Sequence, residues 1–150
     1  MLPETGAKAS GFIDVPLGTW DVDVERRGDG AILMRSKEAL APYPRVITER
    51  LFETARAHPD RIFIAERGED GEWRKITYAQ GAARISSLAE ALLQRDLGPE
   101  RPIAILSPGS NAHALLAMAA AHAGIPYCPV SPAYSLLAKE FSKLDHVLGL

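Results

Sequence analysis

One turn in the sequence has residue types that could bind phosphate. Residues 107–111 (Ser-Pro-Gly-Ser-Asn) lie between a short apolar run and a stretch rich in alanine and leucine, so they are expected to join a strand to a helix. Backbone amides at such a helix N-terminus can bind an anion. The common phosphate loop also needs a Lys-Ser/Thr pair, and the dinucleotide fingerprint needs three spaced glycines. The sequence has neither, which favours the alternative of a tight turn with Ser110 or Asn111 as the helix cap.

The four histidines do not form a metal-binding pattern: they are His58, His113, His122 and His146. His113 and His122 are nine residues apart in one expected helix, whereas a helical metal pair needs i, i+4 spacing. His122 would lie in the last turn of that helix, where the helix dipole favours an imidazolium. Capping or partial burial is expected for each histidine.

Cys128 and Ser135 could act as nucleophiles only if a base activated them. Cys128, the single cysteine, lies in an apolar extended stretch, and His122 lies across a turn from it. An inert buried thiol is therefore expected. A single cysteine also favours a reducing compartment, because it cannot form an internal disulfide. Ser135 has no partnered base and is expected to cap the last helix.

An acidic cluster at an expected hairpin tip completes the candidate groups: Glu66, Glu69, Asp70 and Glu72. A solvated loop explains this cluster without a metal ion. The sequence consequently predicts no catalytic, cofactor-binding or metal-binding residue in this chain.

The first thirty residues are expected to be loosely organised, because glycine and proline interrupt every periodic stretch. Trp20, Val22 and Val24 alternate with acidic residues, which predicts a short strand. Residues 26–30 would form a turn, and residues 31–34 would return as a second strand. A helix is expected next, because apolar residues recur at helical spacing and Pro59 ends the pattern. The apolar residues of that helix are Ile47, Leu51, Phe52 and Ala55.

Two extended runs, residues 62–65 and 73–76, flank a polar segment with two glycines, which predicts an antiparallel hairpin. Thr77 and Gln80 have the spacing of a capping box at the start of a long helix ending near Arg95. The apolar side of that helix is expected to contain Ala82, Ile85, Ala89, Leu92 and Leu93.

The second half of the chain predicts a parallel strand–helix–strand unit. Residues 103–106 form an apolar run, residues 111–123 a helix that ends at Gly124, and residues 125–130 a second extended run. Pro126 and Pro129 weigh against the second strand, because proline cannot donate a backbone hydrogen bond to a neighbouring strand. A last helix is expected from Ser135 to Leu148. The fold class is therefore α/β, with a β-hairpin and a parallel βαβ unit flanked by helices.

Composition excludes several classes of partner. The chain has 17 basic and 19 acidic residues, a net charge of -2, and 47% hydrophobic residues. This balance gives no reason to expect nucleic acid as a partner. No apolar run approaches the ~20 residues of a membrane helix, and no secretory signal is evident, so the cytoplasm is expected.

Two segments resemble the first two core motifs of the AMP-binding acyl-CoA synthetases and their adenylating relatives. Residues 76–80 (Ile-Thr-Tyr-Ala-Gln) are similar to the first motif, and residues 121–132, where a helix ends at Ala-Gly and a strand runs into Pro-x-x-Pro, are similar to the second. The order and separation of the motifs also fit. A narrower similarity to feruloyl-CoA synthetases is carried by residues 21–27, 34–36, 42–45, 48–51 and 130–136.

The resemblance implies part of the amino-terminal subdomain of the adenylate-forming enzyme fold, with residues 1–44 as a partly extended lead-in and residues 45–150 as an incomplete AMP-binding domain. It implies a ligase that uses ATP, Mg²⁺ and CoA to activate a small carboxylate, here an aromatic, feruloyl-like acid. In the family, the phosphate loop ending in Pro-Lys-Gly, the acidic ribose motif and a C-terminal lysine lie further along. These 150 residues contain none of them, so the chain is expected to be an inactive fragment.

Two other functional classes remain open from the sequence. The chain could be a non-catalytic binding or assembly module, including a partner that complements a separately encoded remainder. It could also be an independent small nucleotide-binding protein. For the fragment, unpaired strand edges lead us to expect aggregation or dimerisation.

Overall fold

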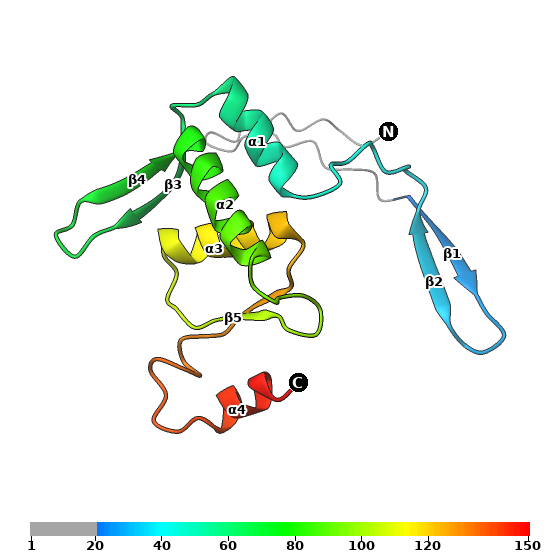
Figure 1. Ribbon diagram of the computed structural model, residues 1–150. Coiled ribbons are helices and arrows are strands. Elements are labelled where there is room, and N and C mark those ends of the chain that lie inside the picture. Colours follow the sequence, from blue (N-terminus) through cyan, green and yellow to red (C-terminus); the bar gives the residue numbers. More distant parts are fainter. Residues whose placement is uncertain (1–20) are drawn as a thin grey trace, which may run out of the picture. The chain divides into compact units, whose positions relative to one another are not determined.

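The structure is a computed structural model that describes residues 21–150 (Figure 1). The chain divides into two compact units, Met1–Tyr43 and Pro44–Leu150. The expectations for residues 1–20, including the place of Trp20 in a strand, lie outside the described residues.

The described part of the first unit is an antiparallel hairpin of β1 (Val22–Arg26) and β2 (Ile32–Ser36). Val24 pairs with Met34 in its register. Gly30, at φ 86°, takes the left-handed conformation that the turn requires. The predicted hairpin is confirmed for these residues.

The second unit contains four helices and two strand pairs. In chain order they are α1 (Thr48–Ala57), β3 (Ile62–Arg67), β4 (Trp73–Thr77), α2 (Tyr78–Leu93), β5 (Ile103–Ile105), α3 (Asn111–Ala123), β6 (Tyr127–Pro129) and α4 (Ser142–Leu148). Among residues 21–150, no helix is long and apolar enough to cross a membrane.

Helix α1 forms as predicted and ends at Ala57, with His58 as its C-cap just before the proline. Leu51 is buried and Phe52 packs against the core. Ile47, expected on the apolar side of the helix, is instead 69% exposed. The reason is positional, because Ile47 is the residue before the first helical turn and does not share the buried face.

The β3–β4 hairpin leads directly into α2, and the junction carries the predicted capping box. The Thr77 hydroxyl accepts a hydrogen bond from the Gln80 backbone N–H at 3.3 Å, and the Gln80 side-chain oxygen accepts one from the Thr77 N–H at 3.1 Å. These two bonds satisfy donors that a helix N-terminus leaves free. They place the start of α2 at the end of β4.

The core lies where α2 packs against α3, with α1 beside them (Figure 1). Ile85 of α2 and Ala119 and Ala120 of α3 are fully buried, and the small alanines let the helices approach closely. Leu93, expected in the apolar set, is 65% exposed. It follows the buried Leu92 by one residue, a rotation of about 100°, which turns it away from α3.

Strands β5 and β6 are parallel and are joined by α3, so the predicted βαβ unit is confirmed. Helix α3 ends at Gly124, whose φ of 72° is left-handed. Pro129 is compatible with the strand because Val130 donates its N–H to the Ile105 carbonyl. Neighbouring amides alternate in direction along a strand, so an N–H at Pro129 would have pointed away from β5.

The last helix is shorter than predicted. Helix α4 covers only Ser142–Leu148, and Ser135 does not cap it. Ser135 is instead buried, and its hydroxyl donates to the Ser131 carbonyl at 3.3 Å. The Tyr134 N–H also donates to that carbonyl. These local bonds hold this segment in turns, in competition with a helix.

Candidate functional site

The turn between β5 and α3, at residues 107–111, is a capped helix start. The Ser110 hydroxyl accepts a hydrogen bond from the His113 backbone N–H at 3.1 Å. Of the two predicted caps, Ser110 is therefore the one used, because its extended backbone directs its oxygen at the first helical turn.

Glu66 occupies the position at which an anion would meet this helix. Its carboxylate Oε2 accepts a hydrogen bond from the Asn111 backbone N–H at 2.6 Å. The Asn111 side chain donates to the Arg74 carbonyl at 2.9 Å. The hairpin β3–β4 thus holds the first residue of α3 from both its strands. Glu66 was predicted to be part of a solvated acidic cluster, and this bond corrects that interpretation.

The helix start consequently does not fit a nucleotide triphosphate. Its first amide already has a carboxylate partner from the same chain, and a second anion at that place would meet the charge of Glu66. Within residues 21–150, no group of three or more histidine, cysteine or acidic side chains could hold a metal ion. The start of α3 therefore does not fit the phosphates of Mg²⁺-ATP.

A second polar pair closes the same turn. The hydroxyl of Ser107 and the ring Nδ1 of His113 are 2.8 Å apart, and both residues are partly buried. The pair has the atoms of a nucleophile and a base, but no hydrogen bond from a third residue orients the ring among the described residues. The sequence did not predict this pair. The conformation of the turn brings the two side chains together, and no regular repeat relates a loop residue to a helix residue six positions later.

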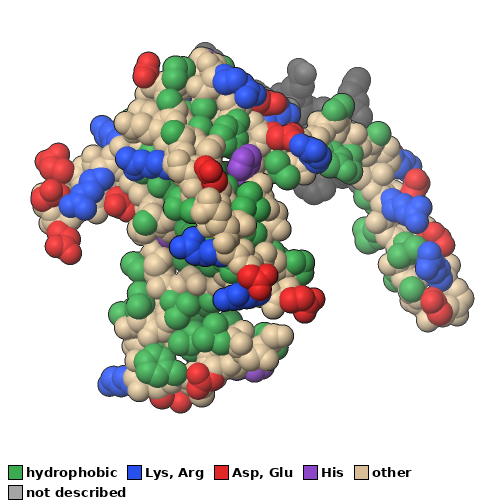
Figure 2. Space-filling model, in the orientation of Figure 1, with side chains coloured by type: hydrophobic (Ala, Val, Ile, Leu, Met, Phe, Trp, Pro, Cys, Tyr) green, Lys and Arg blue, Asp and Glu red, His purple; other side chains and the backbone are tan. Residues whose placement is uncertain are grey.

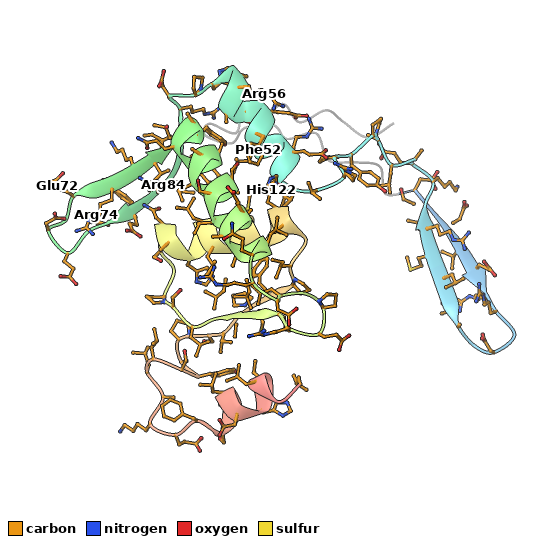
Figure 3. All side chains as sticks on the ribbon, in the orientation of Figure 1. Phe52, Arg56, Glu72, Arg74, Arg84 and His122 are labelled. Atoms are coloured by element: carbon orange, nitrogen blue, oxygen red, sulfur yellow. The ribbon has the colours of Figure 1, made fainter. Side chains whose placement is uncertain are left out.

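His122 links α3 to α1. Its Nδ1 lies 2.9 Å from the hydroxyl of the fully buried Thr48, and its ring lies 4.8 Å from that of Phe52 (Figure 3). A shallow cavity of about 350 Å³ adjoins this contact, lined by Glu49, Phe52, Glu53, Arg56 and His122. Both glutamates already pair with arginines of the same segment. The arrangement joins two helices and does not form a catalytic set.

Cys128 is exposed, and the prediction of a buried thiol is wrong. Strand β6 pairs with β5 alone among the described strands, so no strand lies along its other edge. Cys128 lines a cavity of about 480 Å³ with residues of the C-terminal segment, including Leu148. Figure 2 shows apolar side chains at the surface around β5 and α4.

Comparison with known proteins gives a consistent family match. A sequence model described as AMP-binding enzyme matches residues 51–142. The probable non-canonical nonribosomal peptide synthetase CymA of Salinispora arenicola is 36% identical over 95 residues, which is 63% of this chain and 1% of that protein. A component of the linear gramicidin synthase of Brevibacillus parabrevis is 33% identical over 89 residues, 59% of this chain and 2% of that protein.

Two crystal structures share the fold. IdnL1 aligns with a TM-score of 0.59 at 24% identity over 72% of this chain, and CmiS6 aligns with the same TM-score and identity over 73%. The chain spans 21% and 26% of those two chains. It therefore spans a small part of the proteins that it resembles.

Proposed function

The chain belongs to the AMP-binding enzyme family, and from this premise we propose that it forms the amino-terminal part of an ATP-dependent, adenylate-forming ligase. The observation that carries the proposal is the family match over residues 51–142, which includes the capping box of α2 and the whole βαβ unit. Residues 1–44 would be the lead-in and residues 45–150 an incomplete AMP-binding domain.

The proposed reaction has two steps. A carboxylate oxygen attacks the α-phosphorus of ATP, the bond from that phosphorus to the bridging oxygen breaks, and pyrophosphate leaves. A thiol then attacks the acyl carbonyl, and AMP leaves with the bonding electrons. Both steps need cationic groups where phosphate charge develops. In this proposal another part of the enzyme supplies those groups.

Two acid classes follow from different observations. The lead-in and second motif resemble feruloyl-CoA synthetases, which favours an aromatic acid and CoA as the thiol. Two relatives are named as a nonribosomal peptide synthetase and a linear gramicidin synthase, which favours an amino acid. We keep the aromatic acid as the first candidate and the amino acid as the second. A cytoplasmic location is part of the same proposal.

Pyrophosphate exchange tests whether the 150 residues can form an acyl-adenylate alone or need the rest of the enzyme. The purified 150 residues are assayed with ATP, Mg²⁺ and ferulate, and in parallel with a mixture of the proteinogenic amino acids. We expect no exchange above the protein-free background. The same chain is then assayed with a second polypeptide that carries the family's phosphate loop and C-terminal lysine. Exchange in that mixture would support the proposal and identify the acid class, whereas exchange by the 150 residues alone would refute it.

A non-catalytic assembly module is the alternative, and the exposed apolar surface favours it. Several large apolar side chains near the C-terminus are more than one third exposed: Tyr127, Leu136, Leu137, Phe141, Leu148 and Leu150. We propose that this surface and the free edges of β5 and β6 cause dimerisation or aggregation. Sedimentation velocity at rising concentration checks this, and a monomer throughout the range would contradict it.

A further inference from the structure

Two hairpin turns of this chain share an Asp-Gly pair and the same backbone hydrogen bonding. The turns are residues 27–30, between β1 and β2, and residues 68–71, between β3 and β4. In each turn the last glycine donates its N–H to the carbonyl three residues earlier, at 3.0 Å for Gly30 and 2.9 Å for Gly71. Both glycines have a positive φ, 86° and 83° respectively. The two turns therefore form a matched pair within one molecule.

The aspartates of the two turns are bound alike. Oδ1 of Asp29 accepts a hydrogen bond from the Ala31 N–H at 3.0 Å, and Oδ1 of Asp70 accepts one from the Glu72 N–H at 3.1 Å. Both aspartates are exposed. The residue that follows each aspartate is a glycine, which has no side chain to shield its backbone nitrogen. Each pair therefore has an accessible carboxyl group and an accessible nitrogen a few bonds apart.

The chemistry available to such a pair is closure of a succinimide ring. The glycine nitrogen attacks the aspartate Cγ, a C–N bond forms, and the amide hydrogen leaves with the carboxyl OH as one molecule of water. Water then adds to one of the two ring carbonyls. Opening at the Cγ carbonyl restores aspartate, whereas opening at the main-chain carbonyl gives isoaspartate, whose main chain runs through Cγ. Water is the only co-reactant, and the mass of the chain is unchanged.

Ring closure requires the turn to open first. The closed turn engages the glycine N–H in one hydrogen bond and the aspartate oxygen in another, so neither group is free to approach the other. The free energy of such local opening varies from one part of a structure to another. Because the two turns are alike when closed, the relative rates of reaction should report how often each one opens.

The two hairpins differ in what packs against them. All residues of β1 and β2 are exposed except Leu33, and a two-stranded hairpin with little packing is only marginally stable in water. The hairpin of β3 and β4 is instead anchored to the core, because Ile76 is buried and Phe63 packs against the core cluster. The first hairpin should therefore open far more often than the second.

The tips of the hairpins differ in the same direction. The Arg67 side chain donates Nε–H to the Gly71 carbonyl at 3.0 Å, which ties the second tip to β3. The Asp70 carboxylate and the Arg74 guanidinium also lie against Gly68. At the first tip, the described residues place no side-chain donor on the Gly30 carbonyl, and a Cβ there would meet no atom within 4 Å.

We propose that Asp29 is a site of spontaneous isoaspartate formation, and that Asp70 is protected from the same reaction by the packing of its hairpin and by the bond from Arg67. Isoaspartate adds one carbon to the main chain of the turn, which should disrupt the register of β1 with β2. The reaction needs neither ATP nor the rest of the enzyme, so its outcome is independent of pyrophosphate exchange.

The test is a peptide map of the 150-residue chain after prolonged incubation in neutral buffer. Trypsin releases residues 28–35 and residues 68–74, and each peptide contains one Asp-Gly pair. The isoaspartyl form has the same mass, separates by chromatography and resists a protease that cleaves before aspartate. We expect isoaspartate to accumulate in the first peptide at least about fivefold faster than in the second.

Two controls separate folding from sequence. When the chain is digested first and the free peptides are then incubated, the two rates should agree within about twofold, because neither peptide is folded. When the intact chain is incubated in urea that unfolds it, the rates should converge in the same way.

Matched variants assign the two sites. Asp29→Glu keeps the charge but would need a six-membered ring, so the product should disappear from the first peptide. Arg67→Gln removes the bond to Gly71 and should raise the rate at Asp70 severalfold, read in the longer tryptic peptide of residues 62–74. Arg61→Gln removes the same charge from an exposed arginine outside the turn and should leave that rate unchanged.

Three results would overturn the proposal. The first is the absence of isoaspartate at Asp29 in the intact chain under conditions in which the free peptide reacts. The second is an equal rate at Asp29 and Asp70 in the native chain. The third is a difference that persists in the free peptides, which would assign it to neighbouring residues and not to the fold. An unchanged rate at Asp70 in Arg67→Gln would refute the protecting role of that bond.

Discussion

The Glu66 carboxylate lies 2.6 Å from the backbone nitrogen of Asn111, so a strand residue 45 positions earlier in the chain binds the first amide of α3. This bond connects the hairpin to the central helix of the βαβ unit. It also places a negative charge at a helix N-terminus, where the helix dipole favours it. The same bond therefore stabilises the fold and keeps foreign anions away from this helix start.

Removing this carboxylate should destabilise the chain. Glu66→Ala leaves the Asn111 amide without its partner, and Asn111 is only 9% exposed, so water replaces the bond poorly. We expect a loss of about 1–3 kcal/mol in the free energy of unfolding, measured by urea denaturation. Glu66→Gln should lose less, since it keeps the acceptor. Equal stability of Glu66→Ala and wild type would contradict the structural role of this bond.

The contact between Thr48 and His122 should be measurable as a coupling between α1 and α3. Thr48→Val preserves the shape of a fully buried side chain and removes its hydroxyl. His122 is exposed and can bond to water instead, so the cost should be modest, about 0.5–1.5 kcal/mol. A double-mutant cycle with His122→Ala, read by urea denaturation, isolates the pair. Additive effects of the two substitutions would show that the hydrogen bond contributes nothing.

Gly81 in α2 should not tolerate alanine. A Cβ there would lie 2.8 Å from Cδ1 of Phe63, which packs against the core. Alanine improves helix propensity by about 1 kcal/mol, but overpacking costs about 1–3 kcal/mol. We expect a net lowering of the unfolding free energy by about 1 kcal/mol. Gly98→Ala, with nothing within 4 Å of the added carbon, is the control and should leave stability nearly unchanged.

Thr77 should contribute to the stability of α2 through its capping oxygen. Thr77→Ala removes the acceptor for the Gln80 amide and should lower the free energy of unfolding by about 1 kcal/mol. Thr77→Ser keeps the oxygen and serves as the control. If both variants lose the same stability, the cause is the lost methyl group and not the cap.

The Cys128 thiol should react in the folded state. It is exposed on β6, so a disulfide reagent that reports one equivalent of thiol should react almost as fast with the native chain as with the chain in urea. Protection of the thiol in native buffer, lost on adding urea, would indicate that β6 is covered in solution, for instance in the proposed dimer.

Local patterns in the sequence were sufficient to predict most elements. Helical spacing and a following proline predicted α1, and the spacing of Thr77 and Gln80 predicted the cap of α2. The alternation of strand, helix and strand predicted the parallel unit of β5 and β6. Such signals depend on residues within a few positions of one another, whose relative directions the backbone geometry determines.

The tertiary structure alone decided which side chains meet across elements. Glu66 with Asn111 and Thr48 with His122 join residues 45 and 74 positions apart, and no spacing rule relates such pairs. The exposure of Cys128 likewise depends on how many strands and helices surround β6, and its sequence pattern describes only an apolar strand. Periodicity determines which face of an element is apolar, whereas packing determines what that face contacts.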